Sequence, residues 1–307
     1  MKFLVGTYTK NKSEGIYLVE DENITLQERL FNPSYIAVHD DYIFTIARGG
    51  IEIYLNNDLI YEDHSEAKAP SHIFYEPTLK MIFTANYGAG QMSSYKFDGA
   101  QTKKLQTIIY PTNSHAHQAY YSQTLNSLLV VDLGLDTIFV YEVDKDLKLV
   151  HKRDLTLQKG VGPRHLVVSE KGDIYCLTEH SHEIYHFNNK FEFVRKYQTL
   201  DRQFSGVASA AIKLTNDNKH LYISNRGYDT LTHFIVNNDG SLTRKKVYNV
   251  RGKHPRDFGI SLDETHIVVG NLHSNNLSIF SRNEKNGELK FLKHLYVPEP
   301  TCILFIP

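Results

Sequence analysis

The chain has 307 residues, of which 41% are hydrophobic and 22% charged, and its formal net charge is −1 at pH 7. This is the composition of a soluble globular protein with an extensive core. It has no long run of Lys or Arg, so neither nucleic acid nor an anionic membrane is expected as its partner. Twenty Tyr and 16 Phe against no Trp favour strands, since aromatic side chains pack well on sheets.

The first apolar segment, residues 3–5, is read as a strand. It is too short for a signal peptide and far too short for a membrane span, and no later stretch approaches 18 apolar residues. The two cysteines, Cys176 and Cys302, lie in apolar segments and cannot form a disulfide framework, which indicates buried thiols in a reducing compartment. We therefore expect a cytoplasmic protein.

Similar three-residue segments recur along the chain, each directly before a strand-like apolar run. They begin at Pro33, Pro70, Ala116, Pro163, Ser209, Pro255 and Pro300, with successive spacings of 37, 46, 47, 46, 46 and 45 residues. Such a period is typical of four-stranded propeller blades, and there are seven units.

Each unit repeats the same order of predicted elements. An inner strand is followed by a turn and by a second strand that ends on a polar residue, which in five units lies sixteen residues after the start of the segment. A third strand follows (51–55, 92–97, 137–143, 183–187, 231–236 and 277–280), and then a weaker outer strand such as 191–198 or 243–250. The second strands end on Arg48, Asn86, Asp132, Glu179, Asn225 with Arg226, and Asn271.

The two ends of the chain complete each other. The last unit contains only an inner strand, 301–306, whereas residues 3–7, 15–19 and 25–30 supply three strands without an inner one. Joining them gives a complete seventh blade and removes the exposed edges of an open sheet. The sequence thus predicts an all-β fold, a seven-bladed β-propeller closed by strands from both termini, as a single domain over residues 1–307.

All the recurring segments and all the second-strand ends should meet at one end of the central channel, which is where a site is expected. Arginine suits bidentate recognition of carboxylate or phosphate, so three arginines at one mouth favour an anionic ligand. The alternative is that each arginine pairs with a neighbouring acid and only joins blades. The residues collected there are Tyr35, Arg48, His72, Asn86, His115, His117, Asp132, Arg164, His165, Glu179, Asn225, Arg226, Arg256, Asp257 and Asn271.

The hairpin over residues 160–180 shows how such residues meet. Apolar runs at 166–168 and 174–177 flank a turn at 170–172, which is typical of a β-hairpin. Folding back there brings Arg164 and His165 beside Glu179.

Ser114-His115-Ala116-His117 allows three interpretations, because alternate residues of an extended segment point the same way. We favour His117 as a general base oriented by Asp132, since imidazole titrates near neutrality. A zinc pair completed by Asp132 or Glu179 and a purely structural histidine pair are the alternatives. A Ser–His–Asp hydrolase is disfavoured, because no serine stands in a strand-to-helix turn.

The Gly-rich segment 85–90, ANYGAG, precedes a strand rather than a helix. It is therefore read as a turn between strands and not as a dinucleotide site.

The segments ANYGAG, SHAHQ, VVDLGLDTIFVYEVD, GVGPRHLVV with CLTE, LYISNRGYDTL and HPRDFGIS resemble the lactonase family of seven-bladed propellers, which includes 6-phosphogluconolactonases and carboxymuconate cyclases. The resemblance runs from Gly6 to the last blade. It implies lactone chemistry on an anionic sugar acid or muconate. The catalytic residues that it implies here are His117, Arg164, Glu179 and Arg226.

These residues lead to a specific hypothesis, the hydrolysis of 6-phosphogluconolactone without metal or cofactor. The arginines would hold the phosphate and polarise the carbonyl, and His117 or Glu179 would activate water. We expect a monomer or weak homo-oligomer whose partner is a small anionic sugar lactone. The expected substrate-binding residues are His72, Asn86, His115, Asp132, His165, Arg256, Asp257 and Asn271.

Two positions depart from the pattern of the family: Ala211 stands where relatives often have Glu, and Asp257 where they often have His. Both departures lie near the expected pocket and bear on the substrate. The alternatives are a lactonising cycloisomerase acting on a carboxymuconate-like substrate, and a non-catalytic propeller that binds a protein partner.

Overall fold

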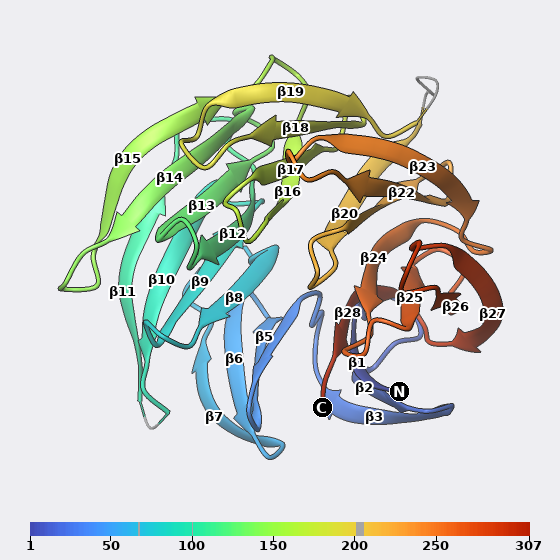
Figure 1. Ribbon diagram of the computed structural model, residues 1–307. Helices are drawn as coiled ribbons and strands as arrows, with labels where there is room; N and C mark the ends of the chain where they lie inside the picture. Colours follow the sequence, from blue (N-terminus) through green and yellow to red (C-terminus); the bar gives the residue numbers. More distant parts are fainter. Residues whose placement is uncertain (67, 100, 201–205) are drawn as a thin grey trace.

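Seven four-stranded antiparallel sheets form the blades of a ring around a central channel (Figure 1). The computed structural model describes residues 1–66, 68–99, 101–200 and 206–307. In these ranges every regular element is a strand, and none of the described residues forms a helix with the length and hydrophobicity needed to cross a bilayer. The prediction of an all-β seven-bladed propeller is confirmed.

The strands of each blade run from the channel outward in chain order, except in the blade that closes the ring. Blades 1 to 3 contain β4 (Ile36–His39), β5 (Tyr42–Ala47), β6 (Gly50–Leu55) and β7 (Asp58–Asp63); β8 (His72–Glu76), β9 (Met81–Asn86), β10 (Gln91–Phe97) and β11 (Thr102–Ile109); and β12 (Ala116–Ser122), β13 (Ser127–Asp132), β14 (Thr137–Val143) and β15 (Leu149–Thr156). Blades 4 to 6 contain β16 (Pro163–Val168), β17 (Ile174–Thr178), β18 (Glu183–Phe187) and β19 (Phe193–Gln198); β20 (Ala208–Leu214), β21 (His220–Arg226), β22 (Thr230–Val236) and β23 (Leu242–Asn249); and β24 (Pro255–Ile260), β25 (His266–Asn271), β26 (Asn276–Arg282) and β27 (Leu289–Tyr296).

Blade 7 joins the two ends of the chain. It consists of β28 (Pro300–Phe305), β1 (Lys2–Thr7), β2 (Gly15–Glu20) and β3 (Asn23–Arg29), in that order from the channel. β28 pairs with β1, so that Val5 lies opposite Ile303, and the two termini lie near each other in Figure 1. The closure predicted from the sequence is confirmed.

The core lies between the blades rather than within any one of them. All residues of β9, β13 and β21 are buried, because both faces of each sheet pack against neighbouring blades, whereas the outer strand β11 alternates between exposed and half-buried residues. One hydrophobic cluster, for example, joins Leu129 and Val131 of blade 3 to Leu166 and Ile174 of blade 4. Such burial supplies most of the stability of an all-β ring.

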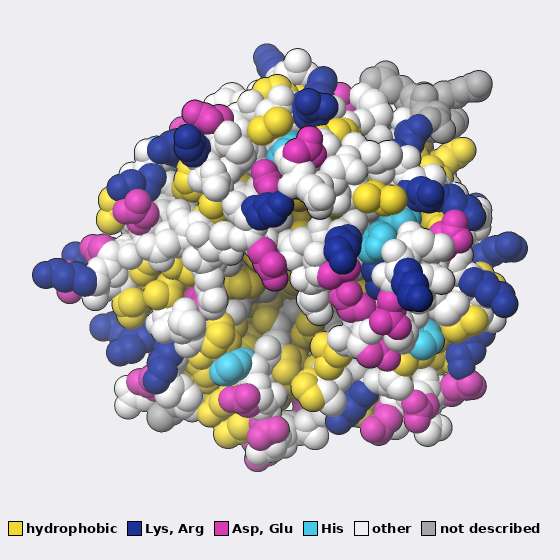
Figure 2. All heavy atoms as spheres, viewed as in Figure 1, with side chains coloured by type: hydrophobic (Ala, Val, Ile, Leu, Met, Phe, Trp, Pro, Cys, Tyr) yellow, Lys and Arg dark blue, Asp and Glu magenta, His cyan; other side chains and the backbone are white. Residues whose placement is uncertain are grey.

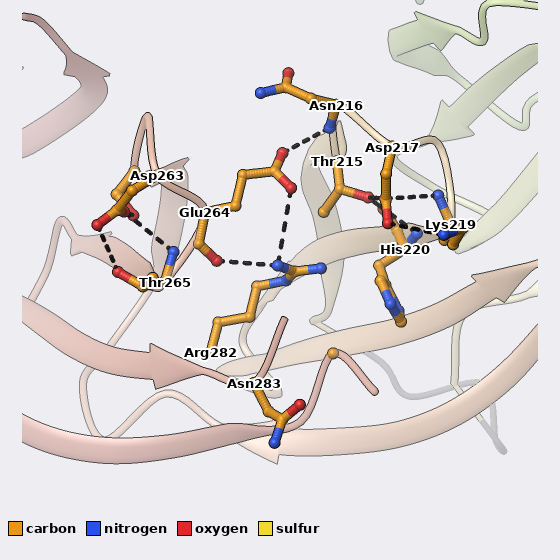
Figure 3. A network of polar contacts seen from close by, with 12 residues as sticks. Thr215, Asn216, Asp217, Lys219, His220, Asp263, Glu264, Thr265, Arg282 and Asn283 are labelled. Atoms are coloured by element: carbon orange, nitrogen blue, oxygen red, sulfur yellow. Dashed lines mark hydrogen bonds and ion pairs between the residues drawn. The ribbon is translucent and has the colours of Figure 1, made fainter. Parts of the chain in front are cut away.

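Polar contacts also connect the blades at the end of the channel where the β20–β21 and β24–β25 turns lie (Figure 3). Arg282 donates from Nη1 to the Glu264 carbonyl oxygen (2.9 Å) and from Nε to the hydroxyl of Tyr222 (3.1 Å). Glu264 Oε1 accepts the backbone N–H of Asn216 from the neighbouring blade at 2.6 Å. The side chain of Arg282 is only 1% exposed, so this cation is fixed inside the protein.

Replacing Arg282 with Ala is expected to lower the free energy of unfolding by about 3 kcal/mol, because it leaves Glu264 without its cation and the buried Tyr222 hydroxyl without its donor. Urea unfolding measures the change. The matched control is Lys285→Ala at an exposed position of the same blade, which should change stability by less than about 0.5 kcal/mol. Equal effects of the two substitutions would contradict a structural role for Arg282.

Candidate functional site

A pocket of about 470 Å³ opens at the end of the channel where inner strands begin and second strands end. Both termini lie at the opposite end, because β1 starts there and β28 ends there. The pocket is lined by Tyr8, Asn32, Ser34, Lys68, Ala69, Pro70, Ser71, Tyr87, Gly88, His117, Arg164, Glu179, Arg226 and Arg256. Five of the residues predicted from the sequence therefore meet in one pocket.

A larger hollow of about 740 Å³ lies at the end that carries the termini. It is lined by apolar side chains such as Leu4 and Ile306, with Lys2, Asp40 and Asp41 as its charged side chains and neither His nor Arg. All its lining residues belong to blades 7 and 1, so it lies to one side of the central channel. In the view of Figure 2, charges of both signs are interspersed over the surface, and hydrophobic side chains are visible in the central hollow. The chemistry-bearing residues are concentrated in the smaller pocket, which is therefore the candidate site.

β-Bulges aim three of the pocket residues. In blades 3, 4 and 6 the pairing of the inner strand with the second strand skips one residue, and the skipped residues are His117, Arg164 and Arg256. A bulge interrupts the alternation of side chains and re-aims the extra residue, and bulges are frequent beside active sites. Consecutive residues of the same strand can therefore both face the channel.

A second layer of side chains lies deeper in the channel and includes His165, which follows the bulged Arg164, together with Tyr35 and His72 from blades 1 and 2. The His72 ring lies 4.3 Å from Tyr35 and 6.0 Å from His165, and the His165 ring lies 4.9 Å from His117 (centroid distances). Burial, aided by the charge of Arg164, lowers the pKa of His72 to about 3 and that of His165 well below its ordinary value. His72 and His165 thus form an uncharged floor beneath the pocket rather than part of its lining.

Glu179 lies between two arginines. Its Oε2 is 2.9 Å from Arg164 Nε and 2.7 Å from Arg226 Nη2. Burial is the largest single influence on the Glu179 pKa and raises it, but the two guanidinium charges together outweigh burial, so the pKa lies below its ordinary value. Glu179 is therefore an ionised bridge whose Oε2 is shared by the two guanidinium groups.

Backbone carbonyl oxygens hold the same two guanidinium groups. Arg164 Nη1 donates to the Ala210 carbonyl, and Arg226 donates from Nε to Ala208 (3.3 Å) and from Nη2 to Ser209 (3.1 Å). Burial and the nearby arginines lower the pKa of Arg164 to about 9, which leaves it cationic at neutral pH. Within the described part of the chain, Arg164 Nη2 and Arg226 Nη1 have no hydrogen-bond acceptor, so each guanidinium retains a donor for a ligand.

His117 lines the pocket as a neutral imidazole. Burial, followed by the positive charge of Arg164, lowers its pKa well below the ordinary value, so the unprotonated form predominates at neutral pH. Its Nδ1 is buried and has no partner among the described residues. The imidazole is therefore in the protonation state that accepts a proton.

Two further cations at the pocket are not neutralised by an acid. Arg256 lies over the Tyr8 ring, with Cζ 5.1 Å from the centroid. The exposed Lys68 side chain packs against the Cα of Gly88, where an added Cβ would lie 2.6 Å from Lys68 Cδ. Neither has a carboxylate partner in the ranges that the structure describes. The pocket lining thus contains Lys68, Arg164, Arg226 and Arg256 against a single carboxylate, Glu179, which favours an anionic ligand.

Several expected site residues lie outside the pocket lining, and their hydrogen bonds explain why. Asn86 donates to Glu66 and to the Lys68 carbonyl, Asn271 donates to Ser278, and Asn225 bonds the hydroxyls of Ser209 and Thr232. Asp257 lies in the deeper layer, accepts the Ile303 N–H at 2.9 Å and lies 3.4 Å from Lys213 Nζ. Arg48 is exposed and does not line the pocket.

The sequence suggested that Asp132 orients His117, but in the structure Asp132 is bonded to other groups. Its carboxylate accepts the Ser114 hydroxyl and the backbone N–H groups of His115, Gly134 and Leu135. The two histidines also lie in different places, because His117 lines the pocket, whereas His115 is absent from the lining and stacks on Tyr87. The zinc set of His115, His117, Asp132 and Glu179 is not assembled: among the described residues, the one group with suitably close donor atoms is Glu52, Glu62 and His64 in blade 1.

The sequence alignment of Glu179 with Asn86, Asp132 and Asn271 is also wrong by one residue. Thr178, rather than Glu179, pairs with Pro163, because the hairpin of blade 4 is one residue shorter than its neighbours. Glu179 therefore takes the position after the strand end, as Tyr87 does after Asn86. That position faces the pocket. Counting one residue past the buried polar end of each second strand would have identified Tyr87 and Tyr8 as lining residues. No pattern in the sequence pointed to Lys68.

The comparisons with known proteins agree with this architecture. A family model described as "Lactonase, 7-bladed beta-propeller" matches residues 2–305. A 6-phosphogluconolactonase of Bacillus subtilis is 28% identical over 98% of this chain and 97% of its own length, and an uncharacterised protein of Lactococcus lactis is 30% identical over 99% and 98%.

Among solved structures, a Lactobacillus plantarum protein superposes with a TM-score of 0.94 at 29% identity over 100% of both chains. The periplasmic gluconolactonase of Pseudomonas aeruginosa superposes with a TM-score of 0.88 over 100% of this chain and 99% of its own, but at 24% identity it supports the fold alone. By the match along nearly its whole length, the chain belongs to the lactonase family of seven-bladed β-propellers.

Proposed function

We propose that this protein hydrolyses a phosphorylated sugar lactone, 6-phosphogluconolactone, to 6-phosphogluconate. The observation that carries the proposal is the excess of cations over carboxylates around one neutral imidazole in the pocket. The similarity to the Bacillus subtilis 6-phosphogluconolactonase supports the same substrate. The proposed location is the cytoplasm, which the two buried free thiols, Cys176 and Cys302, support.

The two kinds of cation suggest two roles. Arg256 and Lys68 have no acid partner, and we assign the phosphate to them. Arg164 and Arg226 are held by Glu179 and by backbone carbonyls, so they suit a fixed position beside the lactone carbonyl oxygen. Donors that are fixed before the reaction stabilise developing negative charge without a reorganisation cost.

His117 is assigned as the general base. It accepts a proton from water while the water oxygen attacks the lactone carbonyl carbon, and the arginines stabilise the oxyanion that forms. The tetrahedral intermediate then collapses, the bond to the ring oxygen breaks, and the His117 imidazolium returns its proton to that oxygen. The products are a hydroxyl and a carboxylic acid, which ionises in water.

Initial-rate hydrolysis of freshly prepared 6-phosphogluconolactone tests the proposal. The expected result is a rate well above spontaneous ring opening at micromolar enzyme, with a smaller kcat/KM for unphosphorylated gluconolactone. A rate no greater than the spontaneous one would reject lactone hydrolysis. Equal kcat/KM for the two lactones would reject the phosphate assignment alone.

The pH dependence of the reaction follows from the lowered pKa of His117. A base with a lowered pKa is already unprotonated at pH 6, and Glu179, whose pKa is also lowered, is ionised there. We therefore expect kcat/KM for unphosphorylated gluconolactone, which has no phosphate group to titrate near pH 6, to vary by less than about twofold between pH 6 and 8 after correction for spontaneous hydrolysis. An acid limb with an apparent pKa near 6.5 would contradict the assignment of a buried imidazole as the base.

Gly88→Ala tests the role of Lys68. An added Cβ would lie 2.6 Å from Lys68 Cδ, so the flexible lysine must move while the backbone stays in place. We expect KM for the phosphorylated lactone to rise about threefold, which corresponds to the binding free energy of one partly exposed charge contact. The kcat and the melting temperature should be nearly unchanged. Lys68→Ala should give the same increase, and a double variant should add little because both changes remove one contact.

A further inference from the structure

Tyr87 is a pocket residue that neither hydrolysis nor phosphate binding requires. It follows Asn86 at the end of β9, lines the pocket and remains 39% exposed. Its ring centroid lies 6.1 Å from that of His117, with the two rings nearly perpendicular at 80°. An aromatic ring this close to the proposed base lies where the body of a substrate would be.

His115 holds the Tyr87 ring in place from behind. The two rings are stacked, with centroids 4.3 Å apart and an angle of 10° between their planes. His115 Nδ1 lies 3.0 Å from the Tyr87 carbonyl oxygen, and because a carbonyl only accepts, the Nδ1 atom carries the proton. One face of the Tyr87 ring is thus covered, and the opposite face is the one available to a ligand.

Blade 3 fixes His115 in turn. Its backbone N–H donates to Asp132 Oδ1 at 2.8 Å, and its ring lies against Gly134, where an added Cβ would be 2.9 Å from Cδ2. His115, Asp132 and Gly134 therefore act on the pocket through Tyr87. This accounts for His115 and Asp132, which the sequence singled out but which do not line the pocket.

We propose that Tyr87, backed by His115, is the surface on which the ring of the cyclic sugar substrate packs, so that the site prefers the closed ring to the open-chain acid. One face of a pyranose-like ring carries C–H groups and packs well on an aromatic face, whereas a flexible chain presents no flat face. The proposal rests on the proposed function for the identity of the sugar. Tyr87 is the contacting residue, and His115 is a positioning residue.

Binding without turnover tests the proposal. Isothermal titration calorimetry would compare 1,5-anhydroglucitol 6-phosphate, which is cyclic and has no carbonyl, with open-chain 6-phosphogluconate. Tyr87→Leu should weaken binding of the cyclic ligand about tenfold and of the open-chain ligand less than about twofold. Tyr87→Phe, which keeps the ring, should retain wild-type affinity for both ligands.

His115→Phe and His115→Ala form a matched pair. The first retains a stacking partner and should preserve the preference, and the second should reduce affinity for the cyclic ligand about threefold while affinity for 6-phosphogluconate is unchanged. Three results would each overturn the proposal. Tyr87→Leu could lose the same affinity for both ligands, or Tyr87→Phe could bind the cyclic ligand as weakly as Tyr87→Leu does. The third result is that the wild type does not bind the cyclic ligand. Failure of the proposed function is seen separately, as the absence of hydrolysis by the wild type.

Discussion

Replacing His117 with Gln is expected to lower kcat for lactone hydrolysis by about 10²–10⁴-fold, the usual contribution of a positioned general base. Gln has a similar size and polarity but cannot accept the proton of the attacking water. His117 Nδ1 has no hydrogen-bond partner among the described residues, so the substitution breaks no hydrogen bond at that nitrogen. Steady-state kinetics with the phosphorylated lactone measure the loss.

The control for this variant is His165→Gln, which changes the histidine directly beneath His117. His165 lies in the deeper layer and outside the pocket lining, so kcat should fall less than about tenfold. Binding of 6-phosphogluconate by His117→Gln should stay within about threefold of the wild type. If His117→Gln kept most of the activity while Glu179→Gln lost it, the base would be Glu179 and our assignment would be wrong.

Replacing Arg164 with Lys is expected to lower kcat by about 10²–10³-fold, as expected for loss of a donor to the oxyanion. Lysine preserves the charge, but its three N–H groups radiate from a single nitrogen and cannot reproduce the planar fork that contacts Glu179 from Nε and the Ala210 carbonyl from Nη1 while Nη2 faces the substrate. KM should change much less, because the interaction is made mainly in the transition state. The split between kcat and KM is the informative measurement.

Arg256→Lys provides the matched comparison, since its guanidinium has no acid partner and is assigned to the phosphate. It should raise KM for the phosphorylated lactone and leave kcat within about threefold of the wild type. Melting temperatures of both variants separate folding defects from chemical ones. If Arg164→Lys raised KM and left kcat intact, Arg164 would belong to the phosphate site instead.

The sequence by itself determined the ring. The 37- to 47-residue period, the constant order of strands and the complementary ends required seven blades closed by both termini, because a strand edge left unpaired is costly. The same period located one end of the channel as the place where His117, Arg164, Glu179, Arg226 and Arg256 meet. Spacing is enough for this, since every blade is built on one pattern.

Only the tertiary structure decided which side chains line the pocket. A repeat gives equivalent positions, but a bulge at His117, Arg164 and Arg256 makes two consecutive residues face inward, which strict alternation does not predict. The shorter hairpin of blade 4 moves Glu179 one residue past the strand end and between two arginines. Bulges and register depend on packing between neighbouring blades, so the pairing of Glu179 and the assembly of Asp132, His115 and Tyr87 emerge only when the ring is formed.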